Sequence, residues 1–249
     1  MPPLTPTLSI IIPAFNEERE LPACLVSIEQ AVAEVQRDPG RADVSTEVIV
    51  CDNNSTDATA AIARAAGAKV TFEPINQISR ARNRGAKLAS ADWMLFVDAD
   101  SRLHPTTLNE VLTAMRRGHC AGGGCIVSLE PAPWWGKCLV QLWNFISRYM
   151  RWPAGSFLFC RSDAYWELGG FSERFYAAEE IEFSQRMKRW ATSHGKKCLI
   201  LTGHPHVSSG RKLMIYGKWD IILLALRAIC CPGRTLGSAH GLGYFYERR

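Results

Sequence analysis

The chain of 249 residues lacks several features that would assign it to common classes of protein. No uninterrupted apolar run is long enough to span a bilayer, and residues 1–7 hold no basic segment followed by an apolar core, so we expect neither a membrane span nor a secretion signal. The nine cysteines form no CxxC and no Cys/His ligand spacing, which argues against a zinc site. No GxGxxG follows the first apolar run, which weighs against a dinucleotide-binding fold.

The composition describes a globular protein with a sizeable core. Hydrophobic residues make up 47% of the chain and charged residues 21%, which excludes a disordered chain. Several cysteines sit within apolar runs, where a reduced cysteine behaves as a small hydrophobe, so a cytoplasmic location is expected. The net charge of +5 fits a protein that binds phosphates or an anionic membrane, although many proteins that bind neither have a similar net charge. We expect no nucleic-acid partner.

Strands and helices alternate through the first half of the chain. Short apolar runs predict buried strands, and Pro13 is expected to end the first of them. Apolar residues at helical spacing predict the helices, and Ser55 or Asp57 is expected to cap the second. The expected strands are residues 8–12, 47–51, 69–72 and 93–97, and the expected helices are residues 18–35, the Ala-rich stretch after residue 57, and residues 78–89. This alternation predicts a mostly parallel α/β sheet with helices on both faces and ligands beyond the carboxyl ends of the strands.

The second half of the chain is less regular. Residues 119–128 contain three consecutive glycines outside any strand-to-helix pattern, so we expect a strand with a bulge and not a phosphate loop. A last strand is expected at residues 197–201. Residues 134–152 predict a Trp-rich amphipathic helix with basic residues largely off its apolar stripe, and residues 213–231 hold a second apolar stretch that is too short and too charged to span a membrane. Each of these two stretches could contact a membrane peripherally, cover the sheet as a helix, or form a homodimer contact.

Two carboxylates, Asp98 and Asp100, follow the apolar run at residues 93–97. Because successive side chains of a strand alternate between its faces, both can point the same way while Ala99 points back. Converging carboxylates suit a hard divalent cation, Mn²⁺ or Mg²⁺, that is shared with phosphate oxygens. An ordinary turn is the alternative interpretation of these residues alone.

Five segments resemble the family-2 glycosyltransferases with the GT-A fold. They are residues 10–18 (IIIPAFNEE), 48–57 (VIVCDNNSTD), 79–85 (SRARNRG), 98–100 (DAD) and 168–183, where the usual Glu-Asp pair is Glu179-Glu180. The resemblance extends over roughly residues 8–212, in the family's order and spacing. It implies a single GT-A domain over residues 1–249, with a nucleotide-sugar-binding half at about 8–128, an acceptor-side half at about 129–212, and a C-terminal helix and tail at 213–249.

The resemblance implies a metal-dependent, inverting transfer of a sugar from a nucleotide diphosphate, expected to be UDP, to an acceptor hydroxyl. Asp52 would accept a hydrogen bond from uracil, with capping of its own loop as the alternative role. Pro13, Phe15 and Glu17 would wall the nucleoside. Arg80, together with Arg82, would hold phosphate or the donor sugar, although basic residues on one helix also form solvated faces.

The metal and the diphosphate also have expected partners by resemblance. Asp100 would coordinate the metal directly, and Asp98 would reach the ribose or a metal-bound water. Either His204 or His206 would bring an imidazole to the metal, with polar surface as the alternative role of both. Arg211 or Lys212 would grip the phosphates.

The pair Glu179-Glu180 is the candidate catalytic pair. Adjacent residues on a helix face different ways, so we expect only one of them to point into the site. Glu180 takes the place of the family's Asp and is the candidate base, with the charge of Glu179 helping to tune its pKa. The Trp-rich helix suggests a lipid-linked or otherwise membrane-presented glycan acceptor, with the protein peripheral on the inner face of the membrane. The alternatives are a nucleotidyltransferase and a catalytically silent GT-A scaffold or binding protein.

Overall fold

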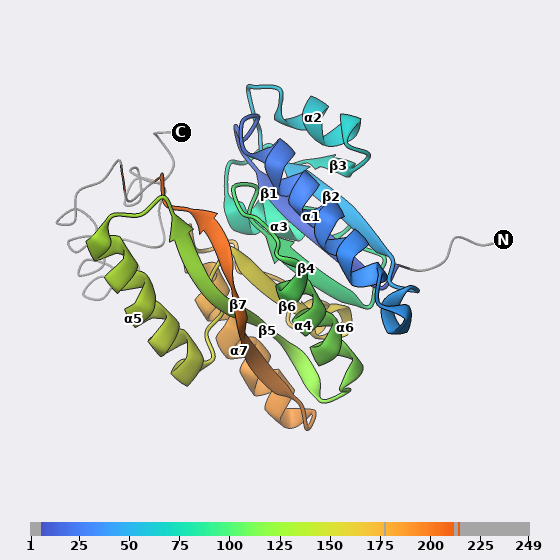
Figure 1. Ribbon diagram of the computed structural model, residues 1–249, viewed down its shortest axis with the longest axis vertical. Helices are drawn as coiled ribbons and strands as arrows, with labels where there is room; N and C mark the ends of the chain where they lie inside the picture. Colours follow the sequence, from blue (N-terminus) through green and yellow to red (C-terminus); the bar gives the residue numbers. More distant parts are fainter. Residues whose placement is uncertain (1–5, 177, 212–213, 215–249) are drawn as a thin grey trace.

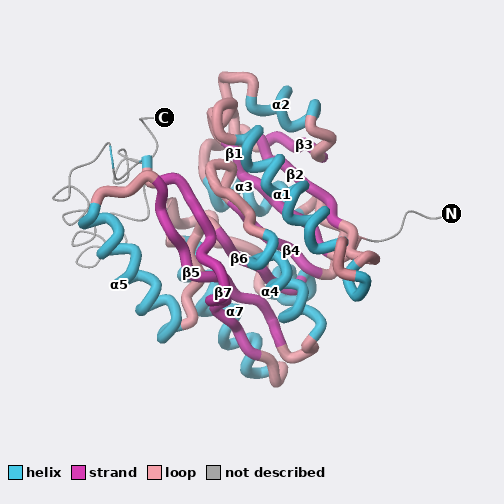
Figure 2. The backbone as a smooth tube through the Cα atoms, in the orientation of Figure 1, coloured by secondary structure: helices cyan, strands magenta, loops and turns pink. Residues whose placement is uncertain are grey.

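A seven-stranded sheet forms the centre of the part of the chain that the computed structural model describes, residues 6–176, 178–211 and 214 (Figures 1 and 2). The strands are β1 (Leu8–Ala14), β2 (Thr46–Asp52), β3 (Lys69–Phe72), β4 (Trp93–Val97), β5 (Cys120–Glu130), β6 (Phe157–Arg161) and β7 (Lys197–Ser209). The helices are α1 (Leu21–Gln36), η1 (Pro39–Arg41), α2 (Thr59–Ala65), α3 (Ile78–Ala86), α4 (Pro105–Arg116), α5 (Trp134–Met150), α6 (Ser162–Glu167) and α7 (Glu179–Ser193). The expectations for residues 212–213 and 215–249 lie outside the described residues.

The strand order is β3-β2-β1-β4-β6-β5-β7. The first four strands along the sheet run parallel, which confirms the pattern predicted from the first half of the chain. β6 is inserted antiparallel between β4 and β5, and β5 pairs with β7 in parallel. The carboxyl ends of β1, β2 and β4 therefore meet at one edge of the sheet, where an α/β fold places its ligands.

Helices cover both faces of the sheet, because the apolar residues of each strand alternate between two cores. On one face α1, α2 and α4 pack against residues such as Ile10, Ile12 and Leu95. On the other face α3, α6 and α7 pack against residues such as Ile11 and Phe96. All of these strand side chains are fully buried. The sheet is thus a buried layer with an apolar core on each face.

Several local expectations need correction. Pro13 lies within β1 and does not end it. The strand pairs with β4 only from Ser9 to Ile11, so at Pro13 the hydrogen bonds to β4 have already ended and a residue without an N–H is tolerated. β7 continues to Ser209, well past the expected end at residue 201, because its second part pairs with β5 beyond a register shift. Neither Ser55 nor Asp57 is the N-cap of α2: Ala58 takes that position without a side-chain cap, although Asp57 Oδ1 accepts a hydrogen bond from the Thr59 N–H at 2.9 Å.

The three consecutive glycines lie in β5, as the sequence predicts, and register shifts mark irregularities in this strand. A Cβ atom at Gly123 would stand 1.8 Å from the Leu199 carbonyl oxygen of β7, and one at Gly122 would stand 2.4 Å from the Phe159 carbonyl oxygen of β6. The glycines therefore allow close backbone approach between neighbouring strands.

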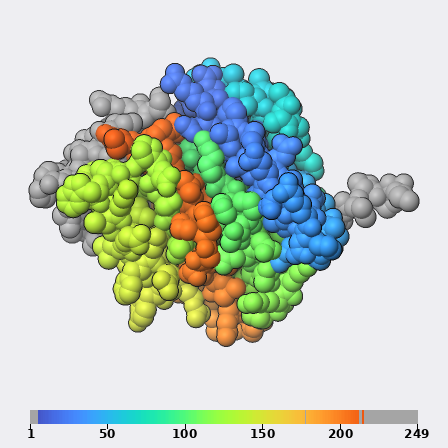
Figure 3. Space-filling view, viewed as in Figure 1, coloured from blue at the N-terminus to red at the C-terminus, as the bar shows by residue number. Residues whose placement is uncertain are grey.

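Helix α5 is attached to the edge of the sheet by polar side chains. The Asn144 amide donates to the Val127 carbonyl at 2.9 Å and accepts from the Val127 N–H at 3.0 Å, beyond the point where β6 stops pairing with β5. The buried residues of α5 are Gly136, Asn144 and Ser147, whereas large apolar residues point outward. Figure 3 shows α5, in yellow-green, as one flank of this face of the molecule. No helix within the described ranges is both long and apolar enough to cross a membrane.

Candidate active site

A cavity of about 250 Å³ opens at the carboxyl ends of β1, β2 and β4. Its walls also include the start of α7 and the segment before β6. The lining residues are Pro13, Ala14, Phe15, Glu17, Asn53, Asn76, Ile78, Arg82, Asp98, Ala99, Asp100, Gly155, Tyr176, Ala178, Glu179 and Glu180. Of the site residues expected from the sequence, Pro13, Phe15, Glu17, Asp98, Asp100, Glu179 and Glu180 are among them.

Arg82 is the structural centre of the cavity floor. Its side chain is buried, with 1% exposure, although it carries a full charge. Nη1 donates to Glu179 Oε1 at 2.7 Å, and Nη2 donates to Asp98 Oδ1 at 3.0 Å and to the Gly155 carbonyl at 2.7 Å. A buried guanidinium is tolerated only when such partners compensate it. Arg82 therefore fixes the relative positions of α3, the end of β4 and the start of α7.

Glu179 and Glu180 both line the cavity, which corrects the expectation that only one of them points there. They occupy the first turn of α7 after Ala178, whose φ of 62° turns the chain sharply into the helix. Glu179 pairs with Arg82, and the Glu180 carboxylate lies against Gly155, where a Cβ atom would stand 3.1 Å from Glu180 Oε1. Gly155 thus leaves room for the longer side chain that replaces the family's Asp.

The two glutamates have shifted acidities. Burial raises the pKa of Glu180 to about 8, and the neighbouring Glu179 carboxylate adds to the rise while Arg82 opposes it. Burial also raises the pKa of Glu179, against the opposing charge of Arg82. The pKa of Glu180 therefore lies near neutral pH, where a general base is most effective.

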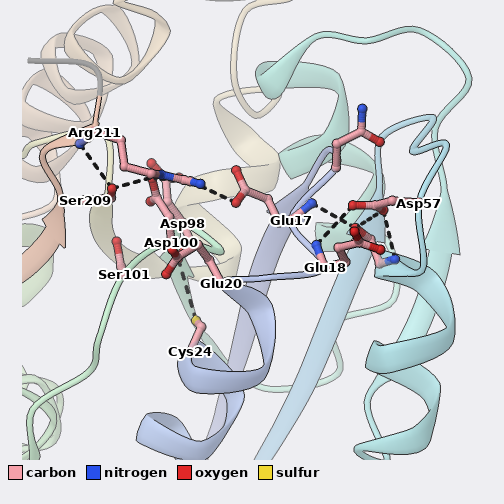
Figure 4. A network of polar contacts seen from close by, with 12 residues as sticks. Glu17, Glu18, Glu20, Cys24, Asp57, Asp98, Asp100, Ser101, Ser209 and Arg211 are labelled. Carbon is pink, nitrogen blue, oxygen red and sulfur yellow. Dashed lines mark hydrogen bonds and ion pairs between the residues drawn. The ribbon is translucent and has the colours of Figure 1, made fainter. Parts of the chain in front are cut away.

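The β1–α1 loop, which carries Glu17, is fastened to the β2–α2 loop. The Glu17 N–H donates to Thr59 Oγ1 at 2.8 Å, the Glu18 N–H donates to Asp57 Oδ2 at 3.1 Å, and Glu18 Oε2 accepts from the Ala58 N–H at 3.2 Å (Figure 4). Glu18 thus has a structural role, because it joins the two loops through its backbone and its side chain. These contacts hold Glu17, which is 5% exposed, at the rim of the cavity.

Asp98 and Asp100 follow the end of β4 and lie close to Arg211 in Figure 4. The Asp98 backbone N–H donates to the Ser156 carbonyl at 3.3 Å, and its carbonyl accepts from the Ser101 N–H at 3.1 Å. Arg211 reaches this pair from the end of β7. Its Nη2 lies 3.0 Å from Glu17 Oε2 and 3.5 Å from Asp100 Oδ2, although Arg211 does not line the cavity.

Asp52 and Asn53 organise the loop after β2. Asp52 Oδ1 accepts from the Ser55 N–H at 2.9 Å, which is the loop-capping role weighed against uracil recognition. The Asn53 amide donates to the carbonyls of Glu73 and Ile75, and its oxygen accepts from the Gln77 N–H. Asn53 also lines the cavity, a position that sequence reasoning missed. Its place in the run Asp52-Asn53-Asn54 after a strand was the available signal.

Arg80 pairs with residues outside the cavity lining. Its Nη2 lies 3.0 Å from Glu173 Oε2, and its Nε donates to Gln77 Oε1 at 3.0 Å, outside the residues that line the cavity. Arg80 therefore ties α3 to the segment before α7. Arg82, two residues along the helix and expected at the site together with Arg80, lines the cavity.

The two histidines of β7 have different surroundings. The ring of His204 stacks on that of His104, the residue that caps α4, with centroids 3.6 Å apart, and His204 is not among the residues that line the cavity. His206 is fully buried beside Phe157, and burial lowers its pKa to about 3 against a smaller contribution from Ser156. The Ser156 contact does not meet hydrogen-bond geometry, so within the described residues both ring nitrogens of His206 are without a hydrogen-bond partner.

The donor atoms at this edge fit a hard divalent cation only in part. Asp98 and Asp100 supply the carboxylate oxygens that Mg²⁺ and Mn²⁺ prefer, whereas the fully buried His206 imidazole is not among the residues that line the cavity. Over the ranges that the structure describes, no group of three or more His, Cys, Asp and Glu residues is arranged to hold a metal. Two carboxylates with a nucleotide's phosphate oxygens are a familiar ligand set for such ions.

Comparison with known proteins identifies the class. Residues 9–164 match the family model described as glycosyl transferase family 2, and the chain therefore belongs to that family. This confirms the resemblance seen in the motifs. Among curated proteins, the 4,4'-diaponeurosporenoate glycosyltransferase of Staphylococcus haemolyticus is 34% identical over 135 residues, which cover 51% of this chain and 32% of that protein. The chain thus spans about a third of the length of this relative.

Solved structures share the fold. The crystal structure of S. aureus TarS 1-349 aligns with a TM-score of 0.63 at 19% identity, over 89% of this chain and 64% of that one. Glucosyl-3-phosphoglycerate synthase from Mycobacterium tuberculosis, in complex with Mn²⁺, uridine diphosphate and glucosyl-3-phosphoglycerate, aligns with a TM-score of 0.58 at 18% identity, over 90% of this chain and 80% of that one. The predicted GT-A type of α/β fold is thereby confirmed.

Proposed function

We propose that this protein is a metal-dependent, inverting glycosyltransferase that moves a sugar from a UDP-sugar to an acceptor hydroxyl. The observation that carries the proposal is the meeting of Asp98, Asp100 and Glu180 in one cavity. Asp98 and Asp100 are suited to hold a cation with its diphosphate, and Glu180, in the same cavity, is suited to accept a proton. The bound Mn²⁺ and uridine diphosphate of the structurally similar synthase support this assignment.

The nucleotide end of the donor would lie over the β1 and β2 ends. Pro13, Phe15 and Glu17 line the cavity there, and Asp52 and Asn53 form the neighbouring loop. In the proposal, Asp52 recognises uracil with the carboxylate that also caps its loop. Mn²⁺ or Mg²⁺, held by Asp98 and Asp100 with His206 as a further candidate ligand, would neutralise charge on the departing diphosphate.

Glu180 is the proposed base. The acceptor hydroxyl gives its proton to the Glu180 carboxylate as its oxygen forms a bond to the anomeric carbon of the sugar. The bond from that carbon to the diphosphate oxygen breaks on the opposite face, and the diphosphate leaves with the electron pair. Arg82 does not touch the reacting atoms in this scheme; it holds Glu179 and Asp98 in place.

The acceptor is proposed to be a lipid-linked or other membrane-presented glycan, reached from the cytoplasmic face of the membrane. The support is the outward face of α5, where Trp134, Leu142, Phe145 and Tyr149 are 76%, 57%, 70% and 81% exposed. Arg148 and Lys137 are exposed on the same helix. Aromatic residues with flanking basic residues are typical of helices that lie in the interface of an anionic membrane.

Thermal unfolding with nucleotides tests the donor assignment. A ligand that binds only the folded state raises the melting temperature, so UDP with Mn²⁺ is expected to raise it, and EDTA is expected to abolish the rise. Asp100→Asn should lose the same shift, whereas the surface variant Glu29→Gln should keep it. A shift with GDP, CDP or TDP but not UDP would contradict the uridine assignment. The absence of any shift for folded protein would contradict the proposal and favour a silent scaffold.

A further inference from the structure

Arg211 joins the far end of the sheet to the proposed metal site. Its Nε donates to Ser209 Oγ at 3.1 Å, and its Nη2 lies 3.0 Å from Glu17 Oε2 and 3.5 Å from Asp100 Oδ2 (Figure 4). Glu17 follows β1 and Asp100 follows β4, so a single guanidinium touches both carboxyl-edge loops. The same guanidinium contacts the aspartate proposed to coordinate the cation.

A guanidinium in this place competes with a divalent cation. Like charges a few ångströms apart repel strongly where protein lowers the effective dielectric constant. A metal that approaches Asp100 alone would therefore meet the charge of Arg211 and share one carboxylate with it. A metal that arrives with a diphosphate brings negative charge, and this offers the guanidinium phosphate oxygens that it can bind with two parallel hydrogen bonds.

We propose that Arg211 is a placeholder cation, which holds Asp100 and Glu17 in the nucleotide-free protein and exchanges them for phosphate oxygens when the metal and nucleotide bind together. This inference rests on the proposed function. The exchange makes the binding of metal and of nucleotide cooperative, because each ligand favours the same displacement of Arg211 from Asp100 and Glu17.

Arg211 has the exposure that such an exchange requires. Its side chain is 44% exposed, and ion pairs of such exposed groups are weak and readily replaced. Arg82, by contrast, is 1% exposed and donates to three acceptors, so it cannot leave its place without abandoning buried carboxylates. The two arginines at the site therefore have different roles, one fixed and one exchangeable.

The variant Arg211→Gln separates the two effects of this residue. Binding of Mn²⁺ alone, followed by electron paramagnetic resonance of the free ion, is expected to become about tenfold tighter, since the competing charge is gone. Binding of UDP at saturating Mn²⁺, followed by calorimetry, is expected to become about tenfold weaker, since a phosphate partner is lost. Arg211→Lys, which keeps the charge, should leave the affinity for Mn²⁺ alone near the wild-type value.

Arg102→Gln is the matched control. Arg102 lies two residues after Asp100 and pairs with Glu20 at 2.8 Å, so Arg102→Gln removes one positive charge from the loop that carries Asp100 without freeing a cavity carboxylate. It should change neither affinity by more than about twofold. If Arg211→Gln weakens both affinities, or changes neither while wild-type protein binds UDP with Mn²⁺, the placeholder role is wrong and the proposed function stands. If wild-type protein does not bind UDP with Mn²⁺, the proposed function itself fails.

Discussion

Arg82 Nη1 lies 2.7 Å from Glu179 Oε1, which joins α3 to the first turn of α7 across 97 residues of chain. Both side chains are almost fully buried, and the same guanidinium also bonds Asp98. This ion pair therefore connects the proposed metal-binding end of the cavity with the proposed catalytic end. The cavity depends on it for its shape.

Replacement of Arg82 by Met should destabilise the fold strongly, because two carboxylates would lose their buried positive partner. The expected loss in the free energy of unfolding is on the order of 3–5 kcal/mol. The double variant Arg82→Met, Glu179→Gln should recover part of this loss, since it removes one of the abandoned charges. Urea denaturation of the wild type, both single variants and the double variant measures the coupling.

The exposed pair of Arg37 and Glu34 provides the control for this cycle. Arg37→Met should change stability little, because solvent screens such a pair. Strictly additive effects of Arg82→Met and Glu179→Gln would contradict the role given to this ion pair.

Glu180→Gln should reduce transfer activity while stabilising the protein at alkaline pH. Loss of the base is expected to lower kcat by about 10²- to 10⁴-fold. The folded pKa of about 8 lies above the ordinary value of 4.5, so the fold favours the neutral carboxyl. The free energy of unfolding therefore falls as pH rises from 4.5 to about 8. Glutamine stays neutral, so the variant should melt several degrees higher than the wild type above about pH 8.

Measurement of melting temperature from about pH 5 to about pH 9 tests this prediction. Glu182→Gln, on the same helix and paired with Arg186, is the control and should track the wild type. Parallel pH profiles for wild type and Glu180→Gln would show that the carboxyl is not held neutral. In the wild type, kcat/KM should rise toward about pH 8 as the base ionises.

Local patterns predicted the first half of the fold, because each of its strands pairs in parallel with neighbours whose apolar runs and following helices are visible in the sequence. The antiparallel insertion of β6 between β4 and β5 depends on pairing between distant residues, which no local pattern encodes. The continuation of β7 past residue 201 has the same origin, since it follows β5 through a register shift.

In the candidate site, too, some positions follow from local sequence and others depend on tertiary contacts. Asp98 and Asp100 were predictable because a strand ends directly before them. The different surroundings of Arg80 and Arg82 were not predictable, because they depend on Glu173 and Glu179, residues that α3 meets only in the folded chain. The stacking of His204 on His104 is likewise a tertiary contact. Ala178 in a left-handed conformation brings both glutamates to the cavity, and alanine gives no sequence signal for that turn.

Phe145→Glu should release the protein from anionic membranes. Phe145 is 70% exposed on α5, and a charge there opposes burial of this face in lipid. Flotation with vesicles that contain phosphatidylglycerol should show wild-type binding that weakens with salt, and at least about fivefold less binding for the variant. Val26→Glu, at a site 49% exposed on α1, makes the same chemical change elsewhere and should bind as the wild type does.

The same face would also suit a second copy of the chain. Sedimentation that shows a dimer in the wild type and a monomer in Phe145→Glu, without vesicle binding by either, would assign α5 to a homodimer and contradict the membrane proposal. Binding to vesicles of neutral lipid alone would contradict the role of the basic residues.

Glu47 should stabilise the sheet at neutral pH but not in acid. It accepts hydrogen bonds from Ser9 Oγ at 2.5 Å and the Ser90 N–H at 2.6 Å, and it pairs with Lys69 at 2.5 Å, so it ties β2 to its neighbours on both sides. Burial would raise the pKa of this carboxyl, but the hydrogen bonds from Lys69, Ser9 and Ser90 outweigh burial and lower the pKa to about 2.

A lowered folded pKa means that the stabilisation is present above the ordinary pKa of 4.5 and is lost as pH falls toward 2. Glu47→Gln should therefore reduce the free energy of unfolding by about 1–3 kcal/mol at neutral pH and by progressively less in acid. Urea denaturation between about pH 7 and about pH 3 measures the difference, with the exposed Glu29→Gln as the control. A difference that stays constant over this range would mean that Glu47 acts through packing and not through its charge.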